Sequence, residues 1–383
     1  MTSTQTVPPE AEELAAKPPL RRRLVRALPA LGSLQGYIGL VLVVLLGIVT
    51  KGDVFWNQTN LTNAIGAFAS RGILAVGVTL VILTGGIDLS VGSVLAFCSM
   101  TSALLLVNHH LYPWEIVPIC MLVGMLFGIA NGLGTTWLRI QSFVMTLAMM
   151  SVARGLTRQL HNNVSVGTML VDRHGHVEKH SKAFLALGTP GHNVFTGVPL
   201  PFVGRDGVYY PVLALVVVCV VFQLILSKTR FGRHVYAVGG NPTAARLSGV
   251  NVTAVTIAVF ALAGLLAGFA GPIDAAYSAS ADPLAGTSFE LDAIAAAVIG
   301  GASLAGGKGT ITGTFVGALI LTLLDNVLGL NQISDNWQLV IKGLIVIVAV
   351  VLQRPGFFRS LASLPAQTRR LARRAGTHQG GSQ

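Results

Sequence analysis

Charged residues are scarce in this chain. Asp, Glu, Lys and Arg make up 11% of the 383 residues, whereas hydrophobic residues make up 52%, and the mean hydropathy is +0.68. This composition excludes an ordinary soluble domain, in which about a quarter of the residues are charged. Long apolar runs fill most of the sequence, and about 20 apolar residues suffice for a helix to cross a bilayer. The sequence therefore predicts an all-α polytopic membrane protein that moves a solute across the membrane.

Cysteine is also rare, and acidic residues are fewer than basic ones. Cys98, Cys120 and Cys219 all lie within apolar runs, which excludes a disulfide framework and a cysteine metal site. The formal net charge of +11 does not indicate nucleic-acid binding, because Lys and Arg gather at the ends of apolar runs. Cytoplasmic loops of membrane proteins collect basic residues in this way. We therefore expect membrane lipid, and no nucleic acid, around these charges.

About ten transmembrane helices are predicted, with broken or re-entrant segments and with both termini cytoplasmic. The expected helices cover residues 35–50, 61–84, 89–107, 115–134, 143–160, 210–227, 252–276, 288–304, 311–329 and 337–353. They form a permease domain over residues 31–354, between a disordered cytoplasmic tail (1–30) and a basic cytoplasmic tail (355–383). Within this domain, 161–209 is a periplasmic loop and 228–250 is a cytoplasmic segment.

Glycine stripes occur in two of these helices. Small residues let membrane helices approach closely, which is where their packing energy comes from. We therefore expect helix–helix contacts at Gly124, Gly128, Gly132, Gly264, Gly268 and Gly271.

A polar break, TGGIDLSVGS at residues 84–93, separates the second and third expected helices. An aspartate near the centre of a membrane helix costs about 2.5–3.5 kcal/mol on insertion scales. We therefore expect Asp88 where the backbone breaks, lines a cavity or nears the cytoplasm. Two interpretations remain open: Asp88, Ser90 and Ser93 cap the third helix, or the broken segment shapes the transport pathway.

The glycine pair of this break recurs as Gly306-Gly307, in a stretch that looks at first like a phosphate-binding loop. The G-x-x-x-x-G-K-[ST] pattern would require Gly at position 302 and Ser or Thr at position 309. The chain has Ala302 and Gly309 instead, and it has no other such motif. We therefore expect no cofactor here, and any ATP that drives the protein is bound by a separate subunit.

The connector 228–250 has too ordered a composition for a slack linker. Asn241 and Pro242 are typical of a helix cap and a first helical residue, and Gly249 is typical of a helix end. The pattern predicts a short cytoplasmic helix over residues 242–248. Such a helix suits contact with a soluble partner, and anchoring at the membrane surface is the alternative.

Three segments, Gly85–Ser93, Phe231–Val250 and Glu290–Asn326, resemble the permease subunits of bacterial ABC importers for monosaccharides, the ribose and xylose permease family. The most specific strings are ELDAIAA at 290–296, GGASLAGG at 300–307 and LDN at 324–326. The similarity covers most of the chain. It implies a non-catalytic subunit of the bacterial inner membrane that carries a monosaccharide, a pentose such as xylose or ribose.

The resemblance also implies partners and sites. Two permease copies form the pathway, a cytoplasmic ABC ATPase docks at residues 228–250, and an extracytoplasmic sugar-binding protein delivers the sugar. The expected pathway and gate residues are Gly85, Gly86, Asp88, Ser90, Ser93, Thr146, Glu290, Asp292, Asp325 and Asn326. The expected ATPase-coupling residues are Arg230, Gly232, Arg233, Gly239, Gly240, Asn241, Ala245, Arg246 and Gly249. Two features depart from the family pattern: Gln141 stands where proline is frequent, and the 161–209 loop is long.

The polar residues of the late helices have two open interpretations. A neutral sugar needs hydrogen-bonding groups along its path but no fixed counter-charge. Asp274, Glu290, Asp292, Asp325 and Asn326 therefore either line the pathway or form structural pairs, for instance with Arg71, Arg154 or Lys342.

Histidines in the outer loop alternate with other residues. His174, His176, Glu178 and His180 would share one face of an extended strand and could there bind zinc. We favour a solvated polar loop and predict no metal site.

Two rival functions were weighed. An ion-coupled secondary transporter of a small polar solute would use Asp88 or Asp325 as its titrating group, but it leaves the ordered 228–250 connector unexplained. A membrane enzyme would need a nucleophile or a metal cluster among the helices, and we find no such group there.

Overall fold

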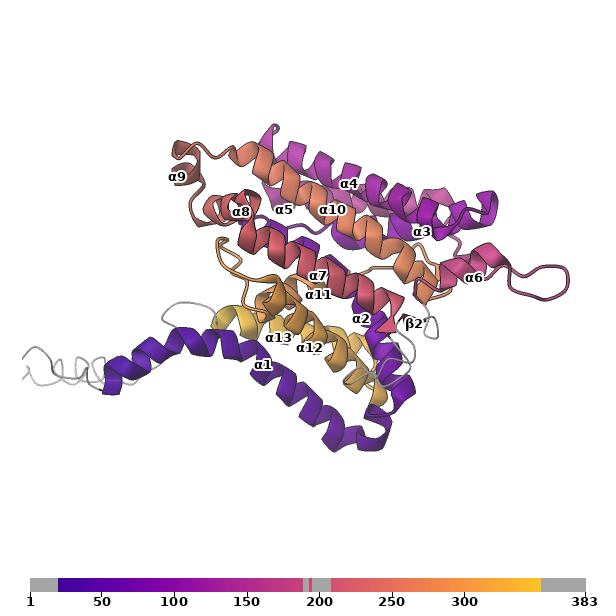
Figure 1. Cartoon of the computed structure of the whole chain (residues 1–383), viewed down its shortest axis with the longest axis horizontal. Coiled ribbons are helices and arrows are strands. Elements are labelled where there is room, and N and C mark those ends of the chain that lie inside the picture. The colour runs from indigo at the N-terminus through magenta and orange to yellow at the C-terminus, as the bar shows by residue number, and fades with distance from the viewer. Residues whose placement is uncertain (1–19, 189–192, 195–207, 353–383) are drawn as a thin grey trace, which may run out of the picture.

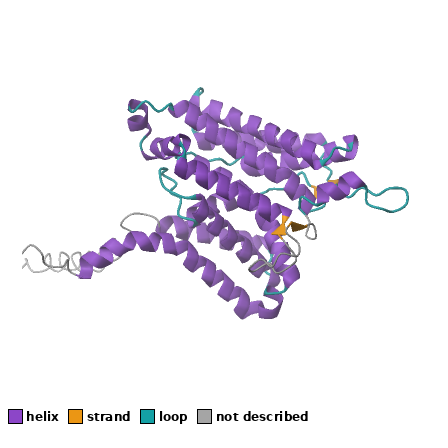
Figure 2. Cartoon of the chain, in the orientation of Figure 1, coloured by secondary structure: helices purple, strands orange, loops and turns teal. Residues whose placement is uncertain are grey.

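The computed structural model describes residues 20–188, 193–194 and 208–352, and within them it forms thirteen helices and four short strands. The helices are α1 (Leu20–Phe55), α2 (Gln58–Leu83), α3 (Val91–His109), α4 (Pro113–Thr136), α5 (Ser142–Leu160), α6 (Lys179–Leu185), α7 (Tyr210–Lys228), α8 (Arg230–Gly240), α9 (Pro242–Leu247), α10 (Val252–Tyr277), α11 (Phe289–Ile299), α12 (Ile311–Leu330) and α13 (Asp335–Leu352). The strands β1 (Val166–Gly167) and β4 (Ser280–Ala281) pair antiparallel, as do β2 (Asn193–Val194) and β3 (Val208–Tyr209). The described part of the chain is thus all-helical apart from these small ladders (Figure 2).

Seven helices of the described ranges are long and apolar enough to cross a membrane: residues 36–55 of α1, then α2, α3, α4, α7, α10 and α12. The other three expected helices correspond to α5, α11 and α13. The expected bounds were wrong at two places. α1 begins at Leu20, inside the expected tail, and α11 has only 11 residues because it ends at Ile299, so that residues 300–304 of the expected helix are not helical.

The core of the bundle lies where α10 packs against α2, α3 and α4. A Cβ on Gly124 of α4 would meet the carbonyl oxygen of Gly264 in α10, and a Cβ on Gly128 would meet that of Phe260. Gly268 similarly lies against Cys120. The expected glycine stripes are therefore confirmed as contacts between backbones, since no side chain would fit between these two helices.

Two helices, α3 and α11, begin next to each other inside the bundle. A Cβ on Gly92 of α3 would meet the carbonyl oxygen of Gly286, just before α11. The non-helical segment 84–90 leads into α3, and the segment 282–288 leads into α11. Non-helical backbone at membrane depth is tolerated where protein or a cavity surrounds it, and both segments meet this condition.

The connecting elements gather at the two ends of the bundle. Figure 1 shows α8 and α9 at one end and α6 with β2 at the opposite end. The end that carries α8 and α9 also receives the loop between α11 and α12, because the N–H of Gly307 donates a hydrogen bond to Leu83 O at the end of α2, 2.9 Å away. The basic connector and the described part of the 161–209 loop therefore lie at opposite ends of the bundle.

Candidate translocation pathway and coupling surface

A cavity of about 310 Å³ lies between α3, α5 and the start of α11. We call it the α3–α5–α11 cavity. Its lining consists of Ser93, Met150, Ser151, Arg154, Arg158, Leu284, Thr287, Ser288 and Glu290. Four hydroxyls, two guanidinium groups and one carboxylate thus face a space inside an otherwise apolar bundle. Such a lining can bind a solute that presents many hydroxyl groups.

Arg154 of α5 organises one wall of this cavity. Its Nη1 donates hydrogen bonds to the carbonyl oxygens of Pro283 and Ala285, at 2.8 and 2.7 Å. These bonds satisfy carbonyls of the non-helical segment before α11, which would otherwise be unpaired in an apolar environment. Arg154 therefore fixes the segment that places Thr287, Ser288 and Glu290 at the cavity.

Ser93 and Glu290 are the two expected pathway residues that line this cavity. The sequence did not single out the α5 residues of the lining, Met150, Ser151 and Arg158, and it treated Arg154 only as a pairing partner. An arginine within an apolar run was the available signal, because intramembrane ionisable residues usually face a cavity or a partner.

Asp88 and Ser90 lie in a buried hydrogen-bond network. Asp88 Oδ1 accepts from the N–H of Ser90 at 2.8 Å and from its hydroxyl at 2.6 Å. Asn131 of α4 in turn donates to Ser90 Oγ at 2.8 Å. The carboxylate therefore stabilises the turn that leads into α3. Ser90 is the N-cap of α3, but no side chain makes a capping hydrogen bond to this helix, so the capping interpretation is not what the structure shows.

Thr146 of α5 supports the same non-helical segment. Its hydroxyl accepts from the N–H of Leu89 at 3.2 Å, and Ser142 Oγ accepts from the N–H of Ile87 at 3.3 Å. Side-chain hydroxyls thus take the place of the missing helical hydrogen bonds. Thr146 holds the backbone of the break in position.

Three glycine pairs, 85–86, 239–240 and 306–307, lie close together, and we call this place the glycine junction. A Cβ on Gly306 would meet Gly239 O and Gly85 N, and a Cβ on Gly239 would meet Leu83 O. Gly85 and Gly306 also have positive φ angles of 82° and 86°, which glycine adopts without cost. The two glycine pairs that recur in the sequence are thus brought together at the end of the bundle that carries α8.

The remaining expected pathway residues form polar pairs elsewhere in the bundle. Arg71 Nη1 lies 2.6 Å from Asp325 Oδ2, and Lys342 Nζ lies 3.0 Å from the same oxygen and 3.1 Å from Asp292 Oδ2. Asn326 exchanges amide hydrogen bonds of 2.7 and 3.0 Å with Asn60. The structure therefore pairs Asp325 with Arg71 and Lys342, and Asp292 with Lys342. Asp325 Oδ2 thus contacts two cationic side chains at once.

The 228–250 segment folds into α8 and α9. Asn241 Oδ1 accepts from Ala244 N at 3.0 Å, and Pro242 opens α9. Gly249 follows with a φ of 84°. The expected short helix is therefore confirmed. The sequence missed α8, whose first turn is capped by Thr229 Oγ1 accepting from Gly232 N at 3.2 Å.

α8 packs against the bundle, whereas α9 projects from it. Gly232 is buried, and Tyr236 donates a hydrogen bond of 2.8 Å to Gly309 O. Burial raises the pKa of the Tyr236 hydroxyl, which therefore stays a donor. On α9 only Ala245 is buried, and Leu247 is 85% exposed. The other expected coupling residues are exposed or half-buried: Arg230, Arg233, Gly239, Gly240, Asn241, Arg246 and Gly249.

Comparisons with known proteins agree with this architecture. A family model described as "Branched-chain amino acid transport system / permease component" matches residues 60–350. The ribose import permease protein RbsC of Escherichia coli (strain K12) is 40% identical over 315 residues, which are 82% of this chain and 91% of that protein. RbsC of Bacillus subtilis (strain 168) is 39% identical over 329 residues, 84% of this chain and 92% of that protein.

A relative with another substrate name is almost as similar. The xylose transport system permease protein XylH of Haemophilus influenzae is 34% identical over 360 residues, 83% of this chain and 96% of that protein. No solved structure matches the chain. The chain therefore belongs to the family of sugar ABC-importer permeases that includes RbsC and XylH, and it is a non-catalytic, multi-pass membrane component.

Proposed function

We propose that the chain forms the membrane pathway through which an ATP-driven importer takes up a monosaccharide, a pentose such as ribose or xylose. The α3–α5–α11 cavity is the observation that carries this proposal. Its volume of about 310 Å³ is near the lower limit of small-ligand sites, as suits a small sugar. Its hydroxyl, guanidinium and carboxylate groups can exchange hydrogen bonds with sugar hydroxyls.

Ten membrane crossings, with both termini in the cytoplasm, fit the order of the helices. The seven long helices account for seven crossings, and α5, α11 and α13 supply three more. The non-helical segments 84–90 and 282–288 lengthen the crossings of α3 and α11. An even number of crossings puts both chain termini on the same side of the membrane. The basic residues of α8 and α9 lie on that side as well, and the excess of Lys and Arg in cytoplasmic loops identifies it as the cytoplasm.

A second copy of the chain would cover α5 and close the cavity. The face of α5 carries exposed apolar side chains, Val152 at 52% and Leu156 at 44%, beside the exposed Arg158 and the uncovered Gly155. Lipid would cover the apolar groups but not the arginine. A partner surface that is both apolar and polar suits this face, and an identical α5 has that character.

The proposed ATPase contact is α9, because its exposed side chains have no partner among the described residues on the bundle side. The motion of a docked ATPase would reach the bundle through α8 and the glycine junction. An extracytoplasmic sugar-binding protein would deliver the solute at the opposite face, which carries the 161–209 loop.

Transport of defined solutes by the complete importer tests this function. The chain is reconstituted into proteoliposomes with its ATPase, and the binding protein is supplied outside. We expect ATP-dependent uptake of a pentose. Leucine serves as the competing solute because the family model also describes amino-acid transport systems. Uptake of leucine without uptake of any sugar would contradict the proposal.

A further inference from the structure

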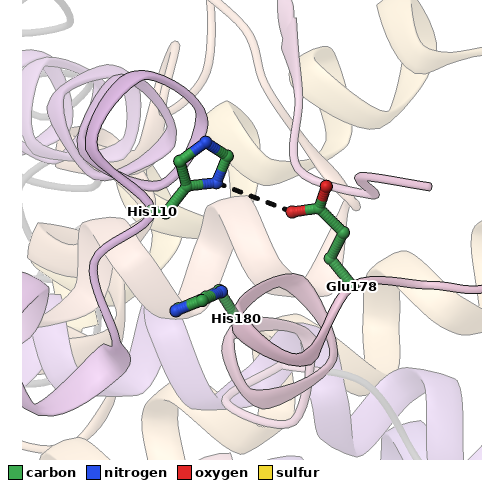
Figure 3. Close-up of side chains that lie close together, drawn as sticks. All are labelled: His110, Glu178 and His180. Atoms are coloured by element: carbon green, nitrogen blue, oxygen red, sulfur yellow. Dashed lines mark ion pairs between the residues drawn. The ribbon is translucent and has the colours of Figure 1, made fainter. Parts of the chain in front are cut away.

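Three potential metal ligands lie together on the face opposite α9. They are His110, Glu178 and His180, and their ligand atoms all lie within 4.8 Å of one another. His110 Nδ1 is 3.5 Å from Glu178 Oε2. Figure 3 shows the imidazole of His110 pointing toward the carboxylate, with His180 beside them.

Two distant parts of the chain bring these side chains together. His110 directly follows α3 in a left-handed conformation with a φ of 50°. Glu178 precedes α6, where its N–H donates to Leu170 O at 2.9 Å, and His180 lies in the first turn of α6. The cluster therefore joins the connection between α3 and α4 to the 161–209 loop.

An aromatic wall closes one side of the cluster. The Tyr112 ring lies 4.2 Å from the His180 ring, centroid to centroid, and stacks on Trp114 at 4.2 Å with 9° between the planes. His180 is half-buried as a result. Its imidazole is thus held in position rather than extended into solvent.

We propose that His110, Glu178 and His180 bind a divalent transition-metal ion, for which Zn²⁺ is the probe. Two imidazoles and one carboxylate are a known ligand set for zinc, with a fourth position open to water or to another ligand. Zn–N and Zn–O bonds of about 2.0–2.2 Å put neighbouring ligand atoms about 3.3–3.5 Å apart. His110 Nδ1 and Glu178 Oε2, which are 3.5 Å apart, already have this spacing, and the ligand atom of His180 lies within 4.8 Å of both.

The histidines that the sequence grouped with Glu178 and His180 lie elsewhere. The N–H groups of His174 and His176 donate to Asp172 Oδ1 at 2.8 and 2.9 Å in a tight turn of the loop. The common face of an extended strand, which was the less favoured interpretation, does not form, because His174 and His176 lie in this turn and α6 begins at Lys179. His110, which is remote in the sequence, lies beside Glu178 and His180 instead. His174 is outside the cluster and therefore serves as a control for the site.

A metal ion here would fasten α6 to the end of α3. The cluster lies on the face where, under the proposed function, a sugar-binding protein docks, so the ion would fix the shape of that docking surface. The open fourth position could also accept a ligand atom from that partner. Metal binding itself does not depend on the transport function, and so the two proposals fail independently.

Zinc titration of the purified full-length chain in lipid nanodiscs tests the site. The protein is prepared without a histidine tag, so that no added histidines bind zinc, and calorimetry gives the stoichiometry and the dissociation constant. We expect about one Zn²⁺ per chain. His110→Ala and His180→Ala should each weaken binding by at least about tenfold, since even second-shell changes at zinc sites cost 10–100-fold. His174→Ala should leave the affinity unchanged.

X-ray absorption at the zinc edge gives a second measurement, in which two imidazoles and a light oxygen ligand at about 2.0–2.2 Å are expected. Glu178→Gln, which keeps the side-chain shape, is the variant to use if a histidine variant fails to fold. Absence of stoichiometric binding, or binding that survives His110→Ala and His180→Ala, overturns the proposal. Equal weakening by His174→Ala overturns it as well.

Discussion

The N–H of Gly307 donates a hydrogen bond of 2.9 Å to the carbonyl oxygen of Leu83. This bond joins the end of α2 to the loop between α11 and α12. Gly239 of α8 lies against both partners, because a Cβ there would meet Leu83 O and Gly307 N. α8 leads directly into the exposed α9. Contacts between backbones therefore connect α8, and with it the exposed α9, to the end of α2 and to the loop between α11 and α12.

Replacement of Gly239 by alanine tests this glycine junction. The added methyl group would meet backbone atoms, which cannot rotate away as a side chain can. We expect a loss of stability of about 1–3 kcal/mol, the usual cost of overpacking, seen as a lower thermal unfolding midpoint, together with reduced ATP-driven uptake. Gly240→Ala is the matched control for stability, since nothing lies within 4 Å of its added Cβ. Equal stability of the two variants would contradict the close approach.

Leu247→Asp tests α9 as the ATPase contact. Leu247 is 85% exposed, so the substitution should leave the thermal midpoint of the chain alone unchanged. A charge in the centre of an apolar docking contact should weaken ATPase co-purification and uptake. Val164→Asp, at a 55% exposed valine on the opposite face, is the control and should retain the ATPase. Normal co-purification and uptake with Leu247→Asp would place the contact elsewhere.

The sequence predicted those parts of the structure that depend on local signals. The helix α9 was predicted from Asn241, Pro242 and Gly249, because each of these residues acts on the helical turn next to it. Likewise, the glycine stripes of two helices indicated close backbone packing, and Gly124 and Gly264 meet as expected. These features need no knowledge of distant neighbours.

Parts that depend on distant contacts were not predictable in this way. α8 contains three glycines, which disfavour a helix, yet it forms because Val235 and Val238 are buried against the bundle. The cavity was missed because Arg154 and Thr287 come from different segments. The outer cluster was missed because His110 lies far in the sequence from Glu178.

The half-buried ion pairs predict a measurable effect of removing one carboxylate charge. Asp325→Asn would remove the negative charge that faces Arg71 at 2.6 Å. Breaking a fully buried pair costs about 3–5 kcal/mol, and we expect a smaller loss here because the Arg71 side chain is 27% exposed. We expect a clearly lower thermal midpoint in detergent. Asp335→Asn, at the exposed start of α13, removes the same charge and should have little effect. An unchanged midpoint with Asp325→Asn would show that this network contributes nothing to stability.

Substitutions in the α3–α5–α11 cavity should affect transport more than folding. Glu290→Gln replaces a charged acceptor by a neutral amide, which makes weaker hydrogen bonds, and Ser93→Ala removes one hydrogen bond to a passing sugar, worth about 0.5–1.5 kcal/mol. That corresponds to a two- to tenfold slower uptake at equal ATPase assembly. Ser227→Ala, at the exposed end of α7, is the control. Wild-type uptake in both cavity variants would contradict a sugar pathway through this cavity.

The central claim is that this chain is a conduit without an energy source of its own, and one comparison in proteoliposomes tests it most directly. Uptake of labelled ribose and xylose is measured for the chain alone, and then for the chain with its ATPase and binding protein in the presence of ATP. The account predicts accumulation only in the complete system, blocked by vanadate and unaffected by an uncoupler. Accumulation of sugar by the isolated chain, or its collapse with the uncoupler, would contradict it.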